Sequence, residues 1–454
     1  MPHLALDPTV VALLFMAFAL ALAFEAVNGC HDTSNAVATI IYTRSMKAPL
    51  AVVWSGIWNF LGVFLGGTAV AFAFVHLLPV SLLASLDTKL EVALILSPLL
   101  AALSWNVATW LLGIPVSSSH SLVGALLGVG VADIWITDRV HGGVLNWHAV
   151  SAVGLALLIS PALGFLLSYL LYRIVRWMSK NPRLHDLAPG ETPPMWLRGV
   201  LTVTCAGVSF AHGSNDGQKT IGLFMLVLMS LAPAVFAVNP ELTSGELLQA
   251  RAAASQLQAK IGQPGGPGDS TAAAARRLTD MLSRARVIAD VPDSDRAQLR
   301  ADILAVTGAA TAAATDSDRK EIGESSKALL RVTEYAPTWV LAISAICLGI
   351  GTMVGWKRIV ITVGEKIGKT DLTPAQGSSA EVVAMATISL ADYGGLPVST
   401  THVLSSGVAG TMTARGSGVQ MSTVKKIGLA WILTLPATML LSTLLFYLFT
   451  RFLK

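Results

Sequence analysis

The sequence has 454 residues, of which 53% are hydrophobic and only 13% are charged, with a formal net charge of +4. Soluble proteins carry about 25% charged residues, so the composition excludes an ordinary soluble globular protein. In the polar segment 239–334 the basic and acidic residues nearly cancel, so nothing indicates nucleic-acid binding. Apolar runs of about 18 or more residues recur along the chain, long enough to cross a bilayer as helices. We therefore predict an all-α polytopic membrane protein.

The first apolar segment is longer than one span requires. It reaches Asn28, meets the polar stretch Gly29-Cys30-His31-Asp32, and continues to Tyr42. A straight helix needs about 20 residues to cross the hydrocarbon core, so a polar centre in a longer segment predicts a discontinuous helix. Residues 196–238 repeat this pattern, with polar residues 212–219 at their centre.

Further membrane segments follow in chain order. They are expected at residues 50–78, 91–112, 121–135 and 147–177, and in the second half at 335–354, 379–394, 403–412 and 427–449. The segments beside Pro115 and Pro397 are short and interrupted by glycine, which predicts re-entrant hairpins. The three cysteines lack a CxxC spacing, so we expect neither a disulfide framework nor a cysteine metal site.

Two motifs occur twice, which divides the chain into related halves. Pro115-Val116-Ser117-Ser118-Ser119-His120 returns as Pro397-Val398-Ser399-Thr400-Thr401-His402, and Gly29-Cys30-His31-Asp32 returns as Gly213-Ser214-Asn215-Asp216. The second pair of motifs is further apart by roughly the length of the polar, alanine-rich segment 239–334. We interpret that segment as an insertion into the second half.

These observations predict four parts. Residues 1–177 form the first transmembrane repeat, 178–195 a cytoplasmic connector, 196–238 with 335–454 the second repeat, and 239–334 a polar helical extramembrane insertion. Lysine and arginine gather after residue 42, around the connector and after residue 354. The positive-inside rule places these three regions in the cytoplasm, so the repeats have inverted topology and the insertion lies outside.

The hydroxyl-rich motifs suit an anion. Proline ends one helix, and serine caps the next, whose N-terminus presents free N–H groups and a positive dipole end. The candidate substrate-binding residues here are Ser117, Ser118, Ser119, Ser399, Thr400 and Thr401. Inverted halves bring two such clusters together near the midplane, where they can hold a tetrahedral oxyanion. The alternative is ordinary capping of a buried helix.

Polar residues inside apolar spans are the second set of candidates, because charges placed there are costly. Asn28, Asn215 and Gln218 are candidate substrate ligands, and the candidate coupling residues are Asp32, Asp216, His31, Lys219, Asn35 and Glu381. Two carboxylates would repel an anion unless a cation, protons or a lysine balances them. The structural alternatives are an Asp–Lys pair that holds helices together, and hydrogen-bonding or packing roles for His31, His120, His212 and His402.

At these motifs the sequence resembles the PiT family of inorganic phosphate transporters, most closely its bacterial members. The resemblance is carried by residues 25–39 (EAVNGCHDTSNAVAT), residues 210–219 (FAHGSNDGQK) and both Pro-Val-Ser motifs. It implies a homodimer in the bacterial cytoplasmic (inner) membrane that transports phosphate, with arsenate as a mimic. It also implies phosphate between the two hydroxyl motifs and coupling cations near Asp32 and Asp216, which are candidate metal ligands.

The sequence departs from the family pattern G-x-N-D-x-x-N at His31 and Lys219. An ammonium group at Lys219 would take the place and charge of a sodium ion, which favours proton coupling. Bacterial relatives are thought to carry phosphate as a neutral complex with a divalent metal. No other cofactor is implied. A sodium-coupled symporter and an anion channel remain alternatives, whereas the absence of a G-x-S-x-G elbow disfavours an enzyme such as a membrane hydrolase.

Overall fold

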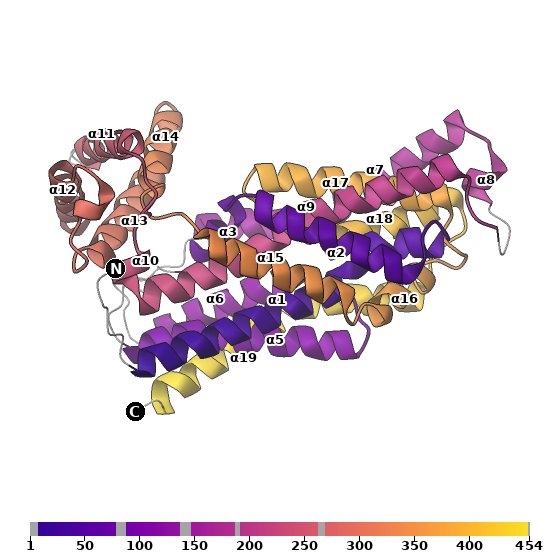
Figure 1. The fold of residues 1–454 in the computed structure, drawn as a ribbon, viewed down its shortest axis with the longest axis horizontal. Coiled ribbons are helices and arrows are strands. Elements are labelled where there is room, and N and C mark those ends of the chain that lie inside the picture. The colour runs from indigo at the N-terminus through magenta and orange to yellow at the C-terminus, as the bar shows by residue number, and fades with distance from the viewer. Residues whose placement is uncertain (1–7, 79–87, 137–146, 187–190, 262–267, 453–454) are drawn as a thin grey trace.

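The computed structural model describes residues 8–78, 88–136, 147–186, 191–261 and 268–452 (Figure 1). These residues are almost entirely helical, and the described part contains one isolated β-bridge, between Gly368 and Val419. Within these ranges, five helices are long and apolar enough to cross a membrane, or up to 6 if a bent helix pair counts as one span. The prediction of an all-α polytopic membrane protein is confirmed.

The first half contains seven described helices. They are α1 (Pro8–Tyr42), α2 (Ala48–Leu65), α3 (Ala69–Val75), α5 (Thr88–Leu111), α6 (Ser118–Ile136), α7 (Trp147–Met178) and the short connector helix α8 (Pro182–His185). The second half begins with α9 (Met195–Leu231) and α10 (Pro233–Phe236), and resumes after the insertion with α15 (Thr338–Met353), α16 (Lys357–Glu365), α17 (Pro374–Tyr393), α18 (Thr400–Arg415) and α19 (Met421–Phe452).

Helices α1 and α9 run antiparallel through the centre of the molecule (Figure 1). Near the end of α1, the Ser45 carbonyl accepts a hydrogen bond from Arg198 Nε at the start of α9, at 2.9 Å. At the opposite end, the rings of Phe18 and Phe224 lie 4.7 Å apart. Because the two helices carry the equivalent Asp motifs, their opposite directions are those of an inverted repeat.

The remaining helices follow the same symmetry. Helix α1 packs against α5 and α15, and α9 packs correspondingly against α17 and α2. The helices that follow the hydroxyl motifs are exchanged between halves, since α6 packs against α19 and α18 against α7. Each half therefore depends on the other for its packing, and the inverted-repeat prediction is confirmed.

The expected break at the Asp motifs is wrong. Both α1 and α9 continue through them without interruption. The glycines of the motifs serve close helix packing instead, because a Cβ at Gly29 would lie 2.7 Å from the Leu348 carbonyl of α15. In the same way, a Cβ at Gly213 would lie 2.2 Å from the Asn59 carbonyl of α2.

Interruptions occur elsewhere. The span expected at residues 50–78 is divided into α2 and α3 by Gly66, Gly67 and Thr68, and Gly67 adopts a φ of +87°. The chain also turns between α5 and α6 and between α17 and α18, at the two hydroxyl motifs, and α15 bends by 63° into α16. Discontinuous helices are thus present, but the Asp motifs lie outside them.

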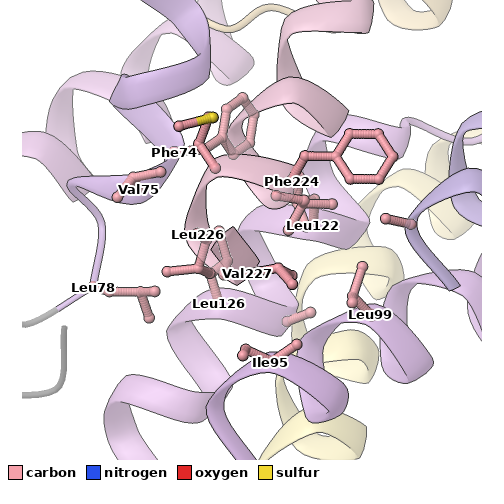
Figure 2. Packing of buried hydrophobic residues seen from close by; sticks show 14 of the residues in the cluster. Phe74, Val75, Leu78, Ile95, Leu99, Leu122, Leu126, Phe224, Leu226 and Val227 are labelled. Carbon is pink, nitrogen blue, oxygen red and sulfur yellow. The ribbon is translucent and has the colours of Figure 1, made fainter. Parts of the chain in front are cut away.

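Apolar packing fixes the end of the bundle near the insertion. Figure 2 shows Phe74 of α3, Leu99 of α5, Leu122 of α6 and Phe224 of α9 packed together, and each is almost completely buried. Burying a large apolar side chain contributes about 1.5–3 kcal/mol. Outward-facing side chains such as Leu158 and Leu440, 73% and 72% exposed, are equally apolar, as expected for a surface in contact with lipid.

The insertion has its own core. Helices α11 (Ser244–Ile261), α12 (Gly268–Arg284), α13 (Arg296–Ala312) and α14 (Arg319–Leu330) enclose an apolar cluster that includes Leu257, Leu278 and Ile303. Arg296 Nη1 donates to the Ala234 carbonyl at 2.6 Å, which ties the insertion to α10. It lies at the end of the bundle opposite α8 (Figure 1).

Candidate functional site

Three ionisable side chains meet where α1 and α9 cross the middle of the bundle. His212 Nε2 lies 3.4 Å from Asp32 Oδ2 and 3.6 Å from Asp216 Oδ2. Lys219, one turn along α9, places its ammonium nitrogen 2.6 Å from Asp216 Oδ2. All four side chains are buried, so these charges interact with little solvent screening.

The orientation of His212 is set by Asn59 of α2. His212 Nδ1 lies 2.6 Å from Asn59 Oδ1, and Asn59 Nδ2 donates to the hydroxyls of Ser55 and Thr352 at 3.3 Å each. Since Asn59 Oδ1 can only accept, Nδ1 must carry the hydrogen. His212 therefore directs Nε2 at the carboxylates, either as a lone pair when neutral or as a donor when protonated.

This arrangement can hold a metal ion as well as a proton. One ligand atom from each of Asp32, His212 and Asp216 lies within 4.8 Å of the others. Imidazole and carboxylates together suit divalent cations, and a ligating histidine commonly donates its second N–H to a neighbouring acceptor, as His212 does. His212 is thus a third candidate metal ligand, beside the predicted ligands Asp32 and Asp216.

Each carboxylate also faces the hydroxyl motif of the other half. Thr401 donates a hydrogen bond to Asp32 Oδ1, and Asn35 Nδ2 donates to the same oxygen at 2.7 Å. Asn35 also reaches the Thr400 hydroxyl at 3.3 Å. In the other direction, Ser118 Oγ donates to Asp216 Oδ2 at 3.2 Å.

The two hydroxyl motifs are in contact with each other. Ser119 Oγ donates to the Val398 carbonyl at 2.9 Å, and the rings of His120 and His402 lie 4.5 Å apart. The two hydroxyl motifs therefore converge, as the repeat predicts. Their contact places neutral hydroxyl donors beside two helix N-termini, next to the Asp32–His212–Asp216 group.

Members of the hydroxyl motifs differ in what they contact. Ser117 and Ser399 cap their helices, accepting from the backbone N–H groups of His120 at 3.2 Å and His402 at 3.1 Å. Ser119 is bonded to a carbonyl. Ser118, Thr400 and Thr401 are the hydroxyls that face the charged group, so they remain the strongest candidates for substrate contact.

Several predicted site residues have other partners. Asn215 Nδ2 donates to the Leu396 carbonyl at 3.1 Å and thereby fixes the loop before α18. Gln218 accepts from the Val70 N–H at 2.7 Å and donates to Asp392 at 2.8 Å, which ties the start of α3 to α9. These contacts give both side chains a positioning role beside the hydroxyl motifs.

His31, Asn28 and Glu381 also lie apart from the central group. His31 Nε2 lies 2.7 Å from the Asn106 carbonyl of α5, and Asn28 Nδ2 lies 3.5 Å from Glu25. Glu381 is buried and accepts from the hydroxyls of Thr39 on α1 and Thr204 on α9.

Sequence reasoning assigned His212 a capping or packing role and Asn59 an interhelical hydrogen bond, and placed neither in the site. A signal for His212 was present, because it precedes Asp216 by four residues and so shares its face of the helix. Asn59 had no such signal, since its role depends on which helix packs against Gly213. Both residues belong to the candidate site.

Comparison with known proteins decides the family. Residues 28–442 match the phosphate transporter family. The chain belongs to that family. This chain is similar to the low-affinity inorganic phosphate transporter PitA of Escherichia coli (strain K12), with 41% identity over 97% of each chain. It is also 40% identical to the low-affinity inorganic phosphate transporter of Buchnera aphidicola subsp. Acyrthosiphon pisum, over 96% of each chain.

A solved structure shares the fold. It is titled "The sodium-dependent phosphate transporter", is 21% identical, and aligns with a TM-score of 0.58 over 97% of this chain and 100% of its own. The family match and the Pit relatives show an inorganic phosphate transporter of the membrane and not an enzyme. The resemblance found in residues 25–39 and 210–219 is confirmed.

Proposed function

We propose that this phosphate transporter is a secondary active symporter that couples phosphate uptake to protons, with phosphate entering alone or as a neutral complex with a divalent metal ion. The observation that carries the proposal is the buried Lys219–Asp216 contact at 2.6 Å beside His212 and Asp32. We further propose a homodimer in the bacterial cytoplasmic membrane, and arsenate, which has the same tetrahedral shape, as a competing substrate.

The charges of the central group support this coupling. Lys219 balances the charge of Asp216 at 2.6 Å, which leaves the charge of Asp32 to be balanced. A proton on His212 would do so, because its Nε2 faces Asp32 Oδ2 at 3.4 Å. A phosphate anion then meets a neutral group with hydroxyl donors, and the electrostatic obstacle to its entry is removed.

A metal-phosphate complex would also remove the electrostatic obstacle to phosphate entry. A divalent cation bound to a phosphate dianion is neutral, which removes much of the desolvation cost of entering a low-dielectric site. Asp32, His212 and Asp216 offer ligands on one side of such a cation, and Ser118 lies beside Asp216 to donate to phosphate oxygen.

The orientation in the membrane follows from the basic end of the bundle. We propose that the end formed by α8, the start of α9 and α16 faces the cytoplasm, because Arg183, Arg198 and Lys357 lie there. The insertion, at the opposite end, then lies outside (Figure 1).

Phosphate uptake into liposomes tests the coupling. A gradient of one pH unit is worth about 1.4 kcal/mol per proton, so one proton per phosphate supports roughly ten-fold accumulation. We expect labelled phosphate to accumulate with an imposed pH gradient at constant sodium. Accumulation that follows a sodium gradient at constant pH would refute proton coupling, and currents without accumulation would indicate an anion channel.

Sodium coupling is the second candidate, because one half of the site retains a set of oxygens. Asn35 Nδ2 donates to the Asp32 carboxylate and to the hydroxyls of Thr400 and Thr401, and Thr401 also donates to Asp32, so these oxygens gather around one amide group. Carboxylate and hydroxyl oxygens suit a hard cation such as sodium. The liposome experiment separates this candidate from proton coupling.

The hydroxyls that face the charged group are expected to bind phosphate. Replacing Ser118 and Thr400 together by Ala should raise the KM for phosphate, because each removed donor contributes about 0.5–1.5 kcal/mol. The measurement is concentration-dependent uptake, with Ser121→Ala as the matched control, since Ser121 Oγ bonds the Ser118 carbonyl at 2.9 Å. An unchanged KM in the double variant would move the substrate elsewhere.

A further inference from the structure

Glu25 is a buried carboxylate that the central group does not use. It lies on α1 and its exposure is 0%. Its Oε2 accepts from the Thr220 hydroxyl of α9 at 2.5 Å and from Asn28 Nδ2 at 3.5 Å, and its Oε1 accepts from the Ser344 hydroxyl of α15 at 3.3 Å. Three helices thus meet at one carboxyl group.

No cation balances this carboxylate among the residues that the structure describes. Its hydrogen-bond partners there are all neutral, and no described Lys, Arg or His forms an ion pair with it. The titratable groups whose charges reach it are Asp216 and His212 from α9, while α15 contributes Cys347. Helix α2 has no titratable residue, and α5 has none after Glu91.

A permanent buried anion in this place would cost several kcal/mol. Asp216 does not relieve that cost, since it is itself an anion already paired with Lys219. Without a nearby positive charge, this cost favours the neutral, protonated form of Glu25. A carboxyl group that must exchange its proton when the local charge changes is a proton-binding site.

The partners of Glu25 can serve both of its protonation states. Ser344 has one hydroxyl hydrogen and two acceptors in reach, Glu25 Oε1 at 3.3 Å and the Gly217 carbonyl at 3.4 Å. When Glu25 is ionised, Ser344 can donate to it. When Glu25 is protonated, Ser344 can turn to Gly217 and accept the carboxyl hydrogen, because a hydroxyl both donates and accepts.

The position of Glu25 connects it to the central group. Its partner Thr220 follows Asp216 by four residues on α9, a rise of about 6 Å, and Gly217 is the next residue after Asp216. Along α1, Glu25 precedes Asp32 by seven residues, or about two turns. Glu381 lies on the other side, held through Thr39, which follows Asp32 by the same interval.

We propose that Glu25 is a proton-binding site of the transport cycle, on the side of the central group nearer the insertion, which exchanges with the His212–Asp32 pair the proton that accompanies phosphate. The proposal rests on proton-coupled transport as proposed above. It assigns Glu25 the exchange of a proton and leaves phosphate contact to Ser118, Thr400 and Thr401. The Glu25→Gln variant keeps the size and hydrogen-bonding capacity of the side chain but cannot ionise.

The experiment compares two activities of the full-length protein in liposomes. The first is accumulation of labelled phosphate driven by a pH gradient, with internal acidification followed by a pH-sensitive dye. The second is exchange of labelled for unlabelled phosphate at equal pH on both sides, which requires no net proton movement. In the Glu25→Gln variant we expect accumulation and phosphate-dependent acidification to be lost while exchange continues at the wild-type rate.

Each other result has a distinct meaning. Accumulation at the wild-type level in Glu25→Gln would overturn the assignment of Glu25 alone, whereas a wild-type protein that fails to accumulate phosphate with a pH gradient would overturn the proposed coupling and this site with it. Loss of both accumulation and exchange would show a structural role and also overturn the proposal.

A second variant, Ser344→Ala, tests the site without changing the carboxyl group. Ser344 can bond both forms of Glu25, but its hydrogen bond to the ionised form is the stronger one. Its removal should therefore favour the protonated form and shift the pH midpoint of accumulation upward. Ser379→Ala, which removes a hydroxyl bonded to the Ala375 carbonyl of its own helix at 2.7 Å, is the matched control and should leave that midpoint unchanged. An unshifted midpoint in Ser344→Ala would contradict the proposal.

Discussion

Replacing Asp32 by Asn is expected to abolish accumulation of phosphate while the protein remains folded. The Asn carbonyl oxygen can still accept from Thr401 and Asn35, and its amide can donate to a neutral His212 Nε2. The hydrogen bonds of the site therefore survive, but the negative charge that binds a proton or a metal ion is gone. Uptake into liposomes and thermal unfolding of the purified protein measure the two effects separately.

The equivalent change at Asp216 should behave differently. Asp216→Asn leaves the Lys219 ammonium buried without its carboxylate, and breaking a buried pair costs about 3–5 kcal/mol. The double variant Asp216→Asn with Lys219→Gln removes both charges and should recover stability without recovering accumulation. If either Asp32→Asn or the stable double variant accumulates phosphate like the wild type, the carboxylates do not couple transport.

The sequence was sufficient to predict the architecture because the repeats are visible in it. The duplicated hydroxyl and Asp motifs predicted two inverted halves, and α1 and α9 do run antiparallel, with Arg198 beside Ser45 at one end and Phe18 beside Phe224 at the other. The predicted convergence of the two hydroxyl motifs also agrees with the contact between Ser119 and Val398.

What sequence could not predict depends on contacts between halves. The polar run at residues 29–32 indicated a break, but the helix continues because its polar side chains find partners on other helices. His31, for example, places its Nε2 2.7 Å from the Asn106 carbonyl of α5. His212 similarly acquires its place from Asn59, 153 residues away in sequence, and no local pattern encodes that distance.

The exchange of contacts between halves also bears on mechanism. Asp32 of the first half binds Thr401 of the second, and Asp216 of the second half accepts from Ser118 of the first. A cation or proton at either carboxylate therefore acts on the hydroxyl motif that belongs to the opposite half. Movement of one half relative to the other would change both contacts together, which is a physical basis for coupling the ion to phosphate.

Lys219→Asn is expected to make phosphate uptake respond to sodium. The change removes the ammonium that lies 2.6 Å from Asp216 and leaves an amide oxygen that can bind a cation in its place. Asp216 then requires another positive charge, and sodium can supply it. The measurement is phosphate uptake at equal pH on both sides, with and without a sodium gradient, for the variant and for the wild type. Wild-type uptake should be the same with and without the sodium gradient.

Lys219→Met is the matched control for that experiment. It removes the same charge and keeps a similar volume, but it offers no oxygen, so its uptake should be low with or without sodium. Sodium stimulation in the Asn variant alone would show that the lysine ammonium occupies a cation position. If uptake by Lys219→Asn instead shows no response to sodium, Lys219 serves only to pair with Asp216. The coupling ion is then selected at Asp32, where Thr400 and Thr401 supply hydroxyl oxygens and Asn35 donates through its amide nitrogen.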